Sequence, residues 1–240
     1  MKAAILERLL KDRAAKHAVV LVTELQSGAQ ALVYPQDMFG DLALDGDALQ
    51  RIRQNLETDD SGTVELGGKR LFLQVQNPSL RLVIIGAVHI AQTLAPMAAL
   101  AGYSVTIVDP RRAFATDARF PDVKLIAEWP DEAMATMKLD RRTAVVTLTH
   151  DPKLDDPALQ TALKSDVFYI GALGSRKTHA ARLARLKAAG FDDAECARIH
   201  GPVGLAIGAE SPAEIAISIL AQITAVLRGA GQPQAQARVA

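Results

Sequence analysis

The spacing of hydrophobic positions changes close to residue 80. Beyond it, short apolar runs alternate with stretches in which apolar residues recur at helical spacing. The runs predict strands at 82–85, 104–108, 124–126, 144–148 and 166–170. The helical stretches lie at 90–101, 130–138, 157–164 and 179–189, followed by a final helix at 212–228. This alternation predicts the α/β class, with a Rossmann-like parallel sheet that carries helices on both faces.

The first 79 residues mix strand and helix periods. They predict a helix at 2–16, strands at 18–25 and 31–34, a helix at 47–57, and a hairpin of 63–66 with 70–75 around Gly67-Gly68. The predicted organisation is a small α+β N-terminal domain at 1–79, a Rossmann-like domain at 80–228, and a tail at 229–240. The tail is low in hydrophobicity, which predicts disorder.

Composition narrows the class of protein. Lys plus Arg and Asp plus Glu balance at 27 each among 240 residues, so no surface for nucleic acid or for an anionic membrane is expected. The longest apolar run, 82–91, is too short to cross a bilayer, and Glu7 and Arg8 interrupt the N-terminal apolar residues, unlike a signal peptide. A single cysteine, Cys196, excludes an intrachain disulfide and fits a reducing compartment. We expect a cytoplasmic protein.

The segment YIGALGSRKTHAARL, residues 169–183, holds the densest group of candidate binding residues. Two glycines lead from a predicted strand toward a predicted helix, with Ser175 and Thr178 as candidate N-caps. A helix start offers free N–H donors, and Arg176 and Lys177 add positive charge, so the segment suits a phosphate. Alternatively, the loop needs only a glycine and a cap, and both cations face water. We favour a ligand site made of Gly171, Gly174, Ser175, Arg176, Thr178 and His179.

The segment 82–111 has the layout of a dinucleotide-binding unit. Gly86 follows the first predicted strand, and Asp109 follows the second, 23 residues later, near where an acidic residue commonly contacts a ribose. Val88 replaces the middle glycine of that fingerprint, and its side chain should obstruct a pyrophosphate. Packing alone would explain Gly86 and Ala91 equally well.

Further candidates follow the other predicted strands. His89, His150, His179 and His200 all lie just past strands, whose carboxyl ends meet at one edge of a parallel sheet, so we expect at least two of them to line a pocket. None has the spacing of a helical zinc site, and no metal site is expected. Arg111 could bind a phosphate or carboxylate in bidentate fashion, or pair with Asp109 or Asp117.

Capping signals and a second glycine-rich loop lie toward the end of the chain. Gly201 and Gly204 are interpreted as part of a second ligand loop. Asp151 is expected to cap a helix or turn, and Ser211 with Glu214 forms a capping box. Cys196 falls in a polar connector and is expected to have no role.

Several of these segments together resemble the XdhC/CoxI family of accessory proteins. The resemblance runs from about Leu82 to Arg228. Its most specific parts are GALGSRKTH and RIHGPVGLAIGAESPAEIA. It rests on GAVHIAQ, VTIVDPR, VTLTHD, YIGALGSRKTHAARL and RIHGPVGLAIGAESPAEIAISILAQI.

The resemblance implies a chaperone that binds molybdenum cofactor (molybdopterin), protects it, and delivers it to a molybdenum hydroxylase of the xanthine dehydrogenase or carbon monoxide dehydrogenase type. It also implies a sulfurtransferase partner, a homodimer and a non-catalytic maturation role, so no catalytic residues are assigned. The cofactor-binding set is Gly86, His89, Asp109, Arg111, His150, Gly171, Gly174, Ser175, Arg176, Thr178, His179, His200, Gly201 and Gly204. Family members commonly carry a Gly-Gly-Cys element in a longer first domain, whereas Gly67-Gly68 is followed here by Lys69.

Two other functions stay open at this point. An NAD(P)-dependent oxidoreductase is favoured by Asp109 but opposed by Val88 and by the lack of an obvious hydride-transfer set. A nucleotide- or pterin-sensing interaction domain without chemistry is the third hypothesis.

Overall fold

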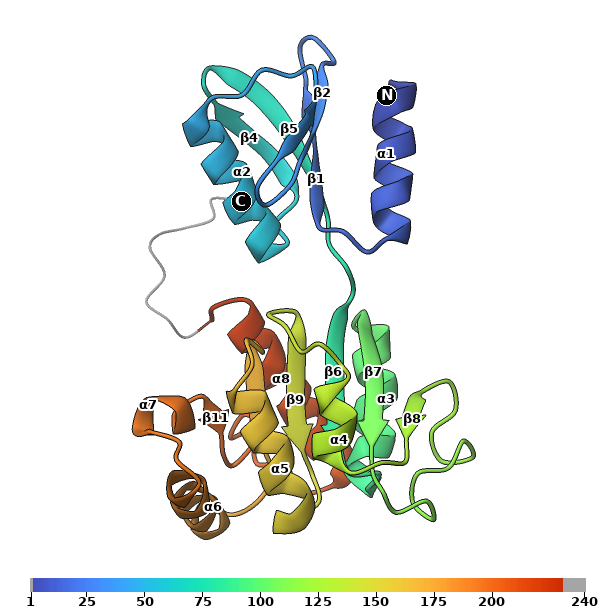
Figure 1. Cartoon of the computed structure of the whole chain (residues 1–240), viewed down its shortest axis with the longest axis vertical. Coiled ribbons are helices and arrows are strands. Elements are labelled where there is room, and N and C mark those ends of the chain that lie inside the picture. The colour runs from blue at the N-terminus through green and yellow to red at the C-terminus, as the bar shows by residue number, and fades with distance from the viewer. Residues whose placement is uncertain (1, 231–240) are drawn as a thin grey trace. The chain divides into compact units, whose positions relative to one another are not determined.

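The computed structural model describes residues 2–230, and Figure 1 shows the whole chain. Most of the tail predicted at 229–240 lies outside the described residues. The chain divides into two compact units between Pro78 and Ser79. No helix in the described part of the chain is long and apolar enough to cross a membrane.

The first unit is an antiparallel sheet with a helix against each face. Its elements are α1 (Ala3–Ala14), β1 (Val19–Glu24), β2 (Gln30–Val33), β3 (Met38–Gly40), α2 (Gly46–Thr58), β4 (Gly62–Leu66) and β5 (Lys69–Gln76). The strand order is β3-β2-β1-β5-β4. Val19, Leu21 and Leu32 pack with α1, while the alternate residues of the same strands pack with α2, as period-two alternation requires. The predicted hairpin at Gly67-Gly68 is confirmed as β4–β5, whereas β3 was not predicted.

The second unit is built on a six-stranded parallel sheet (Figure 1). Its strands are β6 (Leu80–Ile85), β7 (Tyr103–Val108), β8 (Lys124–Ile126), β9 (Thr143–Thr147), β10 (Tyr169–Ala172) and β11 (Ile199–His200). Its helices are α3 (His89–Leu100), α4 (Pro130–Ala135), α5 (Pro152–Leu163), α6 (Arg176–Ala188), α7 (Asp193–Cys196) and α8 (Pro212–Leu227). The order β11-β10-β9-β6-β7-β8 reverses direction between β6 and β9, so ligand-binding loops are expected at the carboxyl ends of these strands.

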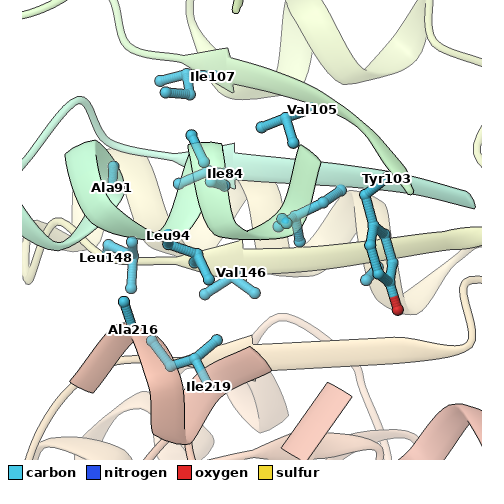
Figure 2. Packing of buried hydrophobic residues seen from close by; sticks show 14 of the residues in the cluster. Ile84, Ala91, Leu94, Tyr103, Val105, Ile107, Val146, Leu148, Ala216 and Ile219 are labelled. Atoms are coloured by element: carbon cyan, nitrogen blue, oxygen red, sulfur yellow. The ribbon is translucent and has the colours of Figure 1, made fainter. Parts of the chain in front are cut away.

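Helices cover both faces of this sheet, which confirms the predicted α/β class. On one face, α3 and α8 pack against β6, β7 and β9, and Figure 2 shows Leu94 and Ile219 meeting Ile84 and Val146 there. On the other face, residues of α4, α5, α6 and α7 pack against Val83, Ile85 and Val145. Because both faces are buried, the strands are continuously apolar rather than alternating.

Three local predictions need correction. The helix predicted from residue 157 begins at Pro152, because Asp151 caps it and Pro152 suits the first helical position. The strand predicted at 166–170 lies at Tyr169–Ala172. Cys196 is not in a polar connector: it ends α7 with 3% exposure and packs in the core. A capping box of Asp192 and Glu195 starts that short helix.

Candidate ligand-binding edge

The predicted binding residues all lie at or just beyond the carboxyl ends of the parallel strands. They occupy the loops after β6, β7, β9, β10 and β11 and the first turns of α3 and α6. These loops therefore share one edge of the sheet, and we refer to them together as the carboxyl edge.

The loop after β6 is held against the loop after β9. Gly86 has φ of +108°, and a Cβ atom at this position would lie 2.5 Å from Thr149 Cγ2. Glycine is required here both by conformation and by this close approach. Val88 caps α3 and its half-buried side chain packs against the core on the α3 face. His89, the first residue of α3, is exposed.

Asp109 is buried beneath the loop after β6. Its Oδ2 accepts a hydrogen bond from the Ala87 N–H at 2.8 Å and one from Arg111 Nη2 at 2.7 Å. Its Oδ1 accepts from the Arg111 N–H and from Arg111 Nε at 3.0 and 2.9 Å. Burial acts to raise the pKa of Asp109, but the hydrogen bonds from Arg111 and Ala87 outweigh it and lower the pKa. Of the alternatives for Arg111, the structure contains the pair with Asp109.

The start of α6 presents backbone donors and two cations. Ser175 is the N-cap, and its Oγ accepts from the Thr178 N–H at 3.1 Å, so Thr178 lies inside the helix. Gly174 has φ of +142°, and a Cβ there would lie 3.1 Å from Thr178. Arg176 and Lys177 are exposed and form no side-chain hydrogen bond or ion pair within residues 2–230. Their own N–H groups have no acceptor within the helix, as in any first turn.

His179 of α6 packs against the loop after β11. Its ring lies so close to Gly201 that a Cβ atom there would be 2.1 Å from His179 Nδ1. That nitrogen is buried without a hydrogen-bond partner among the described residues. Burial, and then the charge of Arg182, lower the pKa of His179, so the neutral ring is favoured.

His200 and Tyr169 form an aromatic stack beside this loop. Their ring centroids are 4.8 Å apart with planes 9° from parallel, and burial lowers the pKa of His200. The Tyr169 hydroxyl donates to Gln222 Oε1 of α8 at 2.6 Å. Gly171 leaves room for this tyrosine, because a Cβ there would meet Tyr169 Cε1 at 2.8 Å.

Gln222 of α8 also binds the loop after β11. Gln222 Oε1 also accepts from the Gly204 N–H at 2.8 Å. Gly204 has φ of +96°, and a Cβ there would lie 2.3 Å from Ser218 Oγ. The predicted capping box of Ser211 and Glu214 is confirmed at the start of α8.

A buried ion pair lies beneath the loops after β9 and β10. Arg182 of α6 donates from Nη2 to the Leu173 carbonyl at 2.8 Å and lies 3.6 Å from Asp155 Oδ2 of α5. Asp155 Oδ1 accepts from the Thr149 hydroxyl at 2.6 Å. Both charged residues are 1% exposed, and burial raises the pKa of Asp155 and lowers that of Arg182. Sequence reasoning missed this pair and Gln222, since no motif marks them.

The remaining candidate, His150, is at the surface. His150 is exposed and adopts φ of +63°, directly before Asp151, the confirmed N-cap of α5. Across residues 2–230, no cluster of three or more His, Cys, Asp or Glu side chains is arranged to hold a metal ion. The carboxyl edge thus offers cations, backbone donors and half-buried imidazoles around buried anchoring contacts.

Comparison with known proteins identifies the family. Residues 82–223, more than half of the chain, match the XdhC Rossmann domain. The chain is 36% identical over 149 residues to the molybdenum cofactor insertion chaperone PaoD of Escherichia coli, covering 62% of this chain and 41% of that protein. It is 34% identical over 154 residues to a probable xanthine dehydrogenase subunit of Bacillus subtilis, covering 64% and 44%.

The fold extends the likeness beyond the matched segment. A crystal structure described as a xanthine dehydrogenase from Bacillus halodurans superposes with a TM-score of 0.70 at 25% identity, covering 97% of this chain and 66% of that one. The chain spans less than half the length of the curated relatives named above. The resemblance predicted from the sequence segments is confirmed, and the chain belongs to the XdhC Rossmann-domain family.

Proposed function

We propose that this protein is a chaperone that binds molybdenum cofactor and delivers it to a molybdenum hydroxylase. The observation that carries the proposal is the 36% identity, over 149 residues, to a relative named as a molybdenum cofactor insertion chaperone. Residues 82–223, which match the XdhC Rossmann domain, include the loops that form the carboxyl edge. Because the chain corresponds to only part of that relative, its activity and its target enzyme are proposals.

The chemistry of the carboxyl edge suits the phosphate that molybdopterin carries. At the start of α6, unpaired backbone N–H groups, the helix dipole and the side chains of Arg176 and Lys177 all favour an anion. His179 adds a buried ring nitrogen without a partner among the described residues. Arg176, Lys177 and Ser175 are therefore proposed to hold the phosphate, with His179 and His200 beside the rest of the cargo.

Release requires that the protein does not hold its cargo by a covalent bond. The only cysteine in the sequence, Cys196, is buried in the core, and burial raises the pKa of its thiol, so its thiolate is disfavoured. Binding is therefore proposed to be non-covalent, with hydrogen bonds and charge holding the phosphate. The hydroxylase then takes the cargo by forming more contacts with it than the chaperone does.

The proposal is tested by equilibrium titration of the full chain with molybdopterin under anaerobic conditions, with NAD and NADP alongside. We expect selective binding of molybdopterin in the micromolar range, about −8 kcal/mol. Arg176→Ala should weaken it by at least about tenfold, since a charge-assisted phosphate contact contributes roughly 1.5–3 kcal/mol.

Arg141→Ala is the matched control, because Arg141 is also an exposed arginine but precedes β9, at the opposite edge of the sheet. An equal loss of molybdopterin affinity in both variants would show that the start of α6 is not part of the binding site. Selective binding of a nicotinamide nucleotide would contradict the chaperone function and favour an oxidoreductase.

The oxidoreductase alternative gains no support from the geometry. Asp109 was the residue that favoured it, yet its carboxylate is occupied by Arg111 and Ala87. A sensing domain remains distinguishable, since it would bind molybdopterin without increasing the activity of a hydroxylase.

A sulfurtransferase partner, a homodimer and a cytoplasmic location complete the proposal. All three follow from the family resemblance. Sedimentation analysis of the full chain tests the dimer, which should persist at micromolar concentration, whereas a single monomeric species would contradict it. Co-purification with a sulfurtransferase from a cell extract, lost when a competing purified chain is added, tests the partner.

A further inference from the structure

The loop after β7 carries an exposed aromatic ring paired with an arginine. Phe114 is 46% exposed, and the Arg111 guanidinium carbon lies 4.8 Å from the centre of its ring. Arg119 approaches the same ring at 5.9 Å and donates to the Phe114 carbonyl at 2.8 Å, which fixes the loop. Arg111 keeps 38% of its side chain accessible. A planar cation and an aromatic ring therefore stand together at the carboxyl edge.

The carboxylate beside this pair has no acceptor position to offer a ligand. Asp109 is fully buried and accepts four hydrogen bonds, one from Ala87 and three from Arg111. A carboxylate has about four lone-pair sites, so its capacity is used. In dinucleotide folds an acidic residue at this position binds the ribose hydroxyls. Here the same position serves to anchor Arg111 and the loop after β6.

We propose that the end of β7 is a subsite for the nucleoside part of a nucleotide-bearing ligand, in which the base stacks on the Arg111–Phe114 pair. This inference rests on the proposed function, because it assigns the nucleotide portion of a dinucleotide form of the cofactor to this end of the edge. Stacking on aromatic rings and on arginine is favourable and tolerant of the identity of the base. Within residues 2–230 the hydrogen bonds of Arg111 use its N–H, Nε and Nη2, which leaves Nη1 available to a phosphate.

A specificity follows from the occupied carboxylate. Since Asp109 cannot accept hydrogen bonds from sugar hydroxyls, the subsite does not distinguish ribose from 2′-deoxyribose. The protein then binds its ligand through the base and the phosphate, and the sugar contributes little to the affinity. This separates it from nucleotide sites in which a free carboxylate selects the ribose.

The test uses nucleoside monophosphates as probes, so that it does not depend on molybdenum. We would titrate the full chain with CMP, AMP and their 2′-deoxy counterparts, following chemical shifts by NMR. We expect all four to bind with affinities that differ by less than about threefold, well under the 1.4 kcal/mol of a tenfold change. Phe114→Ala, which leaves the Asp109–Arg111 contacts intact, should weaken binding by about tenfold.

Arg112→Ala is the matched control, because Arg112 is exposed, lies next to Arg111 and makes no ring contact among the described residues. Its affinities should equal those of the unaltered chain. Arg111→Ala should weaken the deoxynucleotides more than the ribonucleotides, because it frees the carboxylate for ribose hydroxyls.

Three results would overturn the subsite: absence of nucleotide binding, a marked preference of the unaltered chain for ribose, or equal affinity in Phe114→Ala. Each is independent of the molybdopterin titration. Loss of nucleotide binding with retained molybdopterin binding would refute the subsite alone, and the reverse result would refute the chaperone alone.

Discussion

Polar side chains at the carboxyl edge pair with partners far away in the sequence. Tyr169 and Gln222 are 53 residues apart, and Asp109 and Ala87 are 22 apart. Sequence patterns identified the glycines and helix caps, because these depend on local conformation. They could not identify Gln222 or Arg182, because a glutamine or arginine in a helix gives no local sign of being buried.

The buried Asp155–Arg182 pair should matter for stability. Arg182→Leu leaves the buried Asp155 carboxylate without its counter-ion and should reduce the free energy of unfolding by about 3–5 kcal/mol. The double variant Asp155→Leu with Arg182→Leu removes both charges and should recover much of that loss. Urea unfolding followed by fluorescence of Trp129, the only tryptophan, reports on the second unit. Equal losses in the single and double variants would contradict this account.

Stability should also depend on pH through the half-buried histidines. The pKa values of His179 and His200 are lowered by burial, so the unfolded chain takes up protons first as pH falls below about 6.5. The stabilisation is complete above that pH and is lost as pH falls toward the lowered folded-state pKa values.

The variant His200→Phe separates titration from stacking. It keeps an aromatic ring against Tyr169 but cannot be protonated. Urea midpoints compared at about pH 7.5 and about pH 5.5 should differ less in this variant than in the unaltered chain. An identical pH dependence in the two proteins would show that His200 does not contribute.

At the scale of elements, the alternation of strands and helices in the second unit was predictable because each strand is buried and apolar. The predicted helix boundaries were wrong where a capping residue lies before the first residue of the apolar pattern. The helix was predicted to start at His179, with Ser175 and Thr178 as candidate caps; Ser175 is the cap, and the helix starts at Arg176. The short elements α7 and β11 were missed because two to four residues are too few to show a period.

The loop after β11 offers a test of close approach between elements. Gly204 and Gly208 both have positive φ, but only Gly204 lies against α8, where a Cβ would meet Ser218 Oγ at 2.3 Å. Gly208→Ala should therefore show the conformational cost of a side chain at positive φ alone, roughly 1–2 kcal/mol. Gly204→Ala should reduce the free energy of unfolding by about 1–3 kcal/mol more than Gly208→Ala, because its Cβ overpacks against α8. Thermal unfolding of the two variants measures the difference, and equal midpoints would mean that the loop does not pack on α8 as described.

At the scale of the whole molecule, the family match lies within the second unit, at residues 82–223. The class of that unit followed from periodicity, and the family followed from combined motifs such as GALGSR and RIHGP. The fold alone does not determine the cargo, because parallel sheets of this order bind many ligands at the same edge.

Transfer of cofactor is the most direct test of the central claim. The full chain would be loaded anaerobically with molybdenum cofactor and mixed with a cofactor-free molybdenum hydroxylase, and the activity gained would be compared with that from free cofactor. We predict faster and more complete activation by the loaded protein, and a smaller effect when Arg176→Ala is used. Activation no better than with free cofactor, at full loading, would contradict the chaperone function.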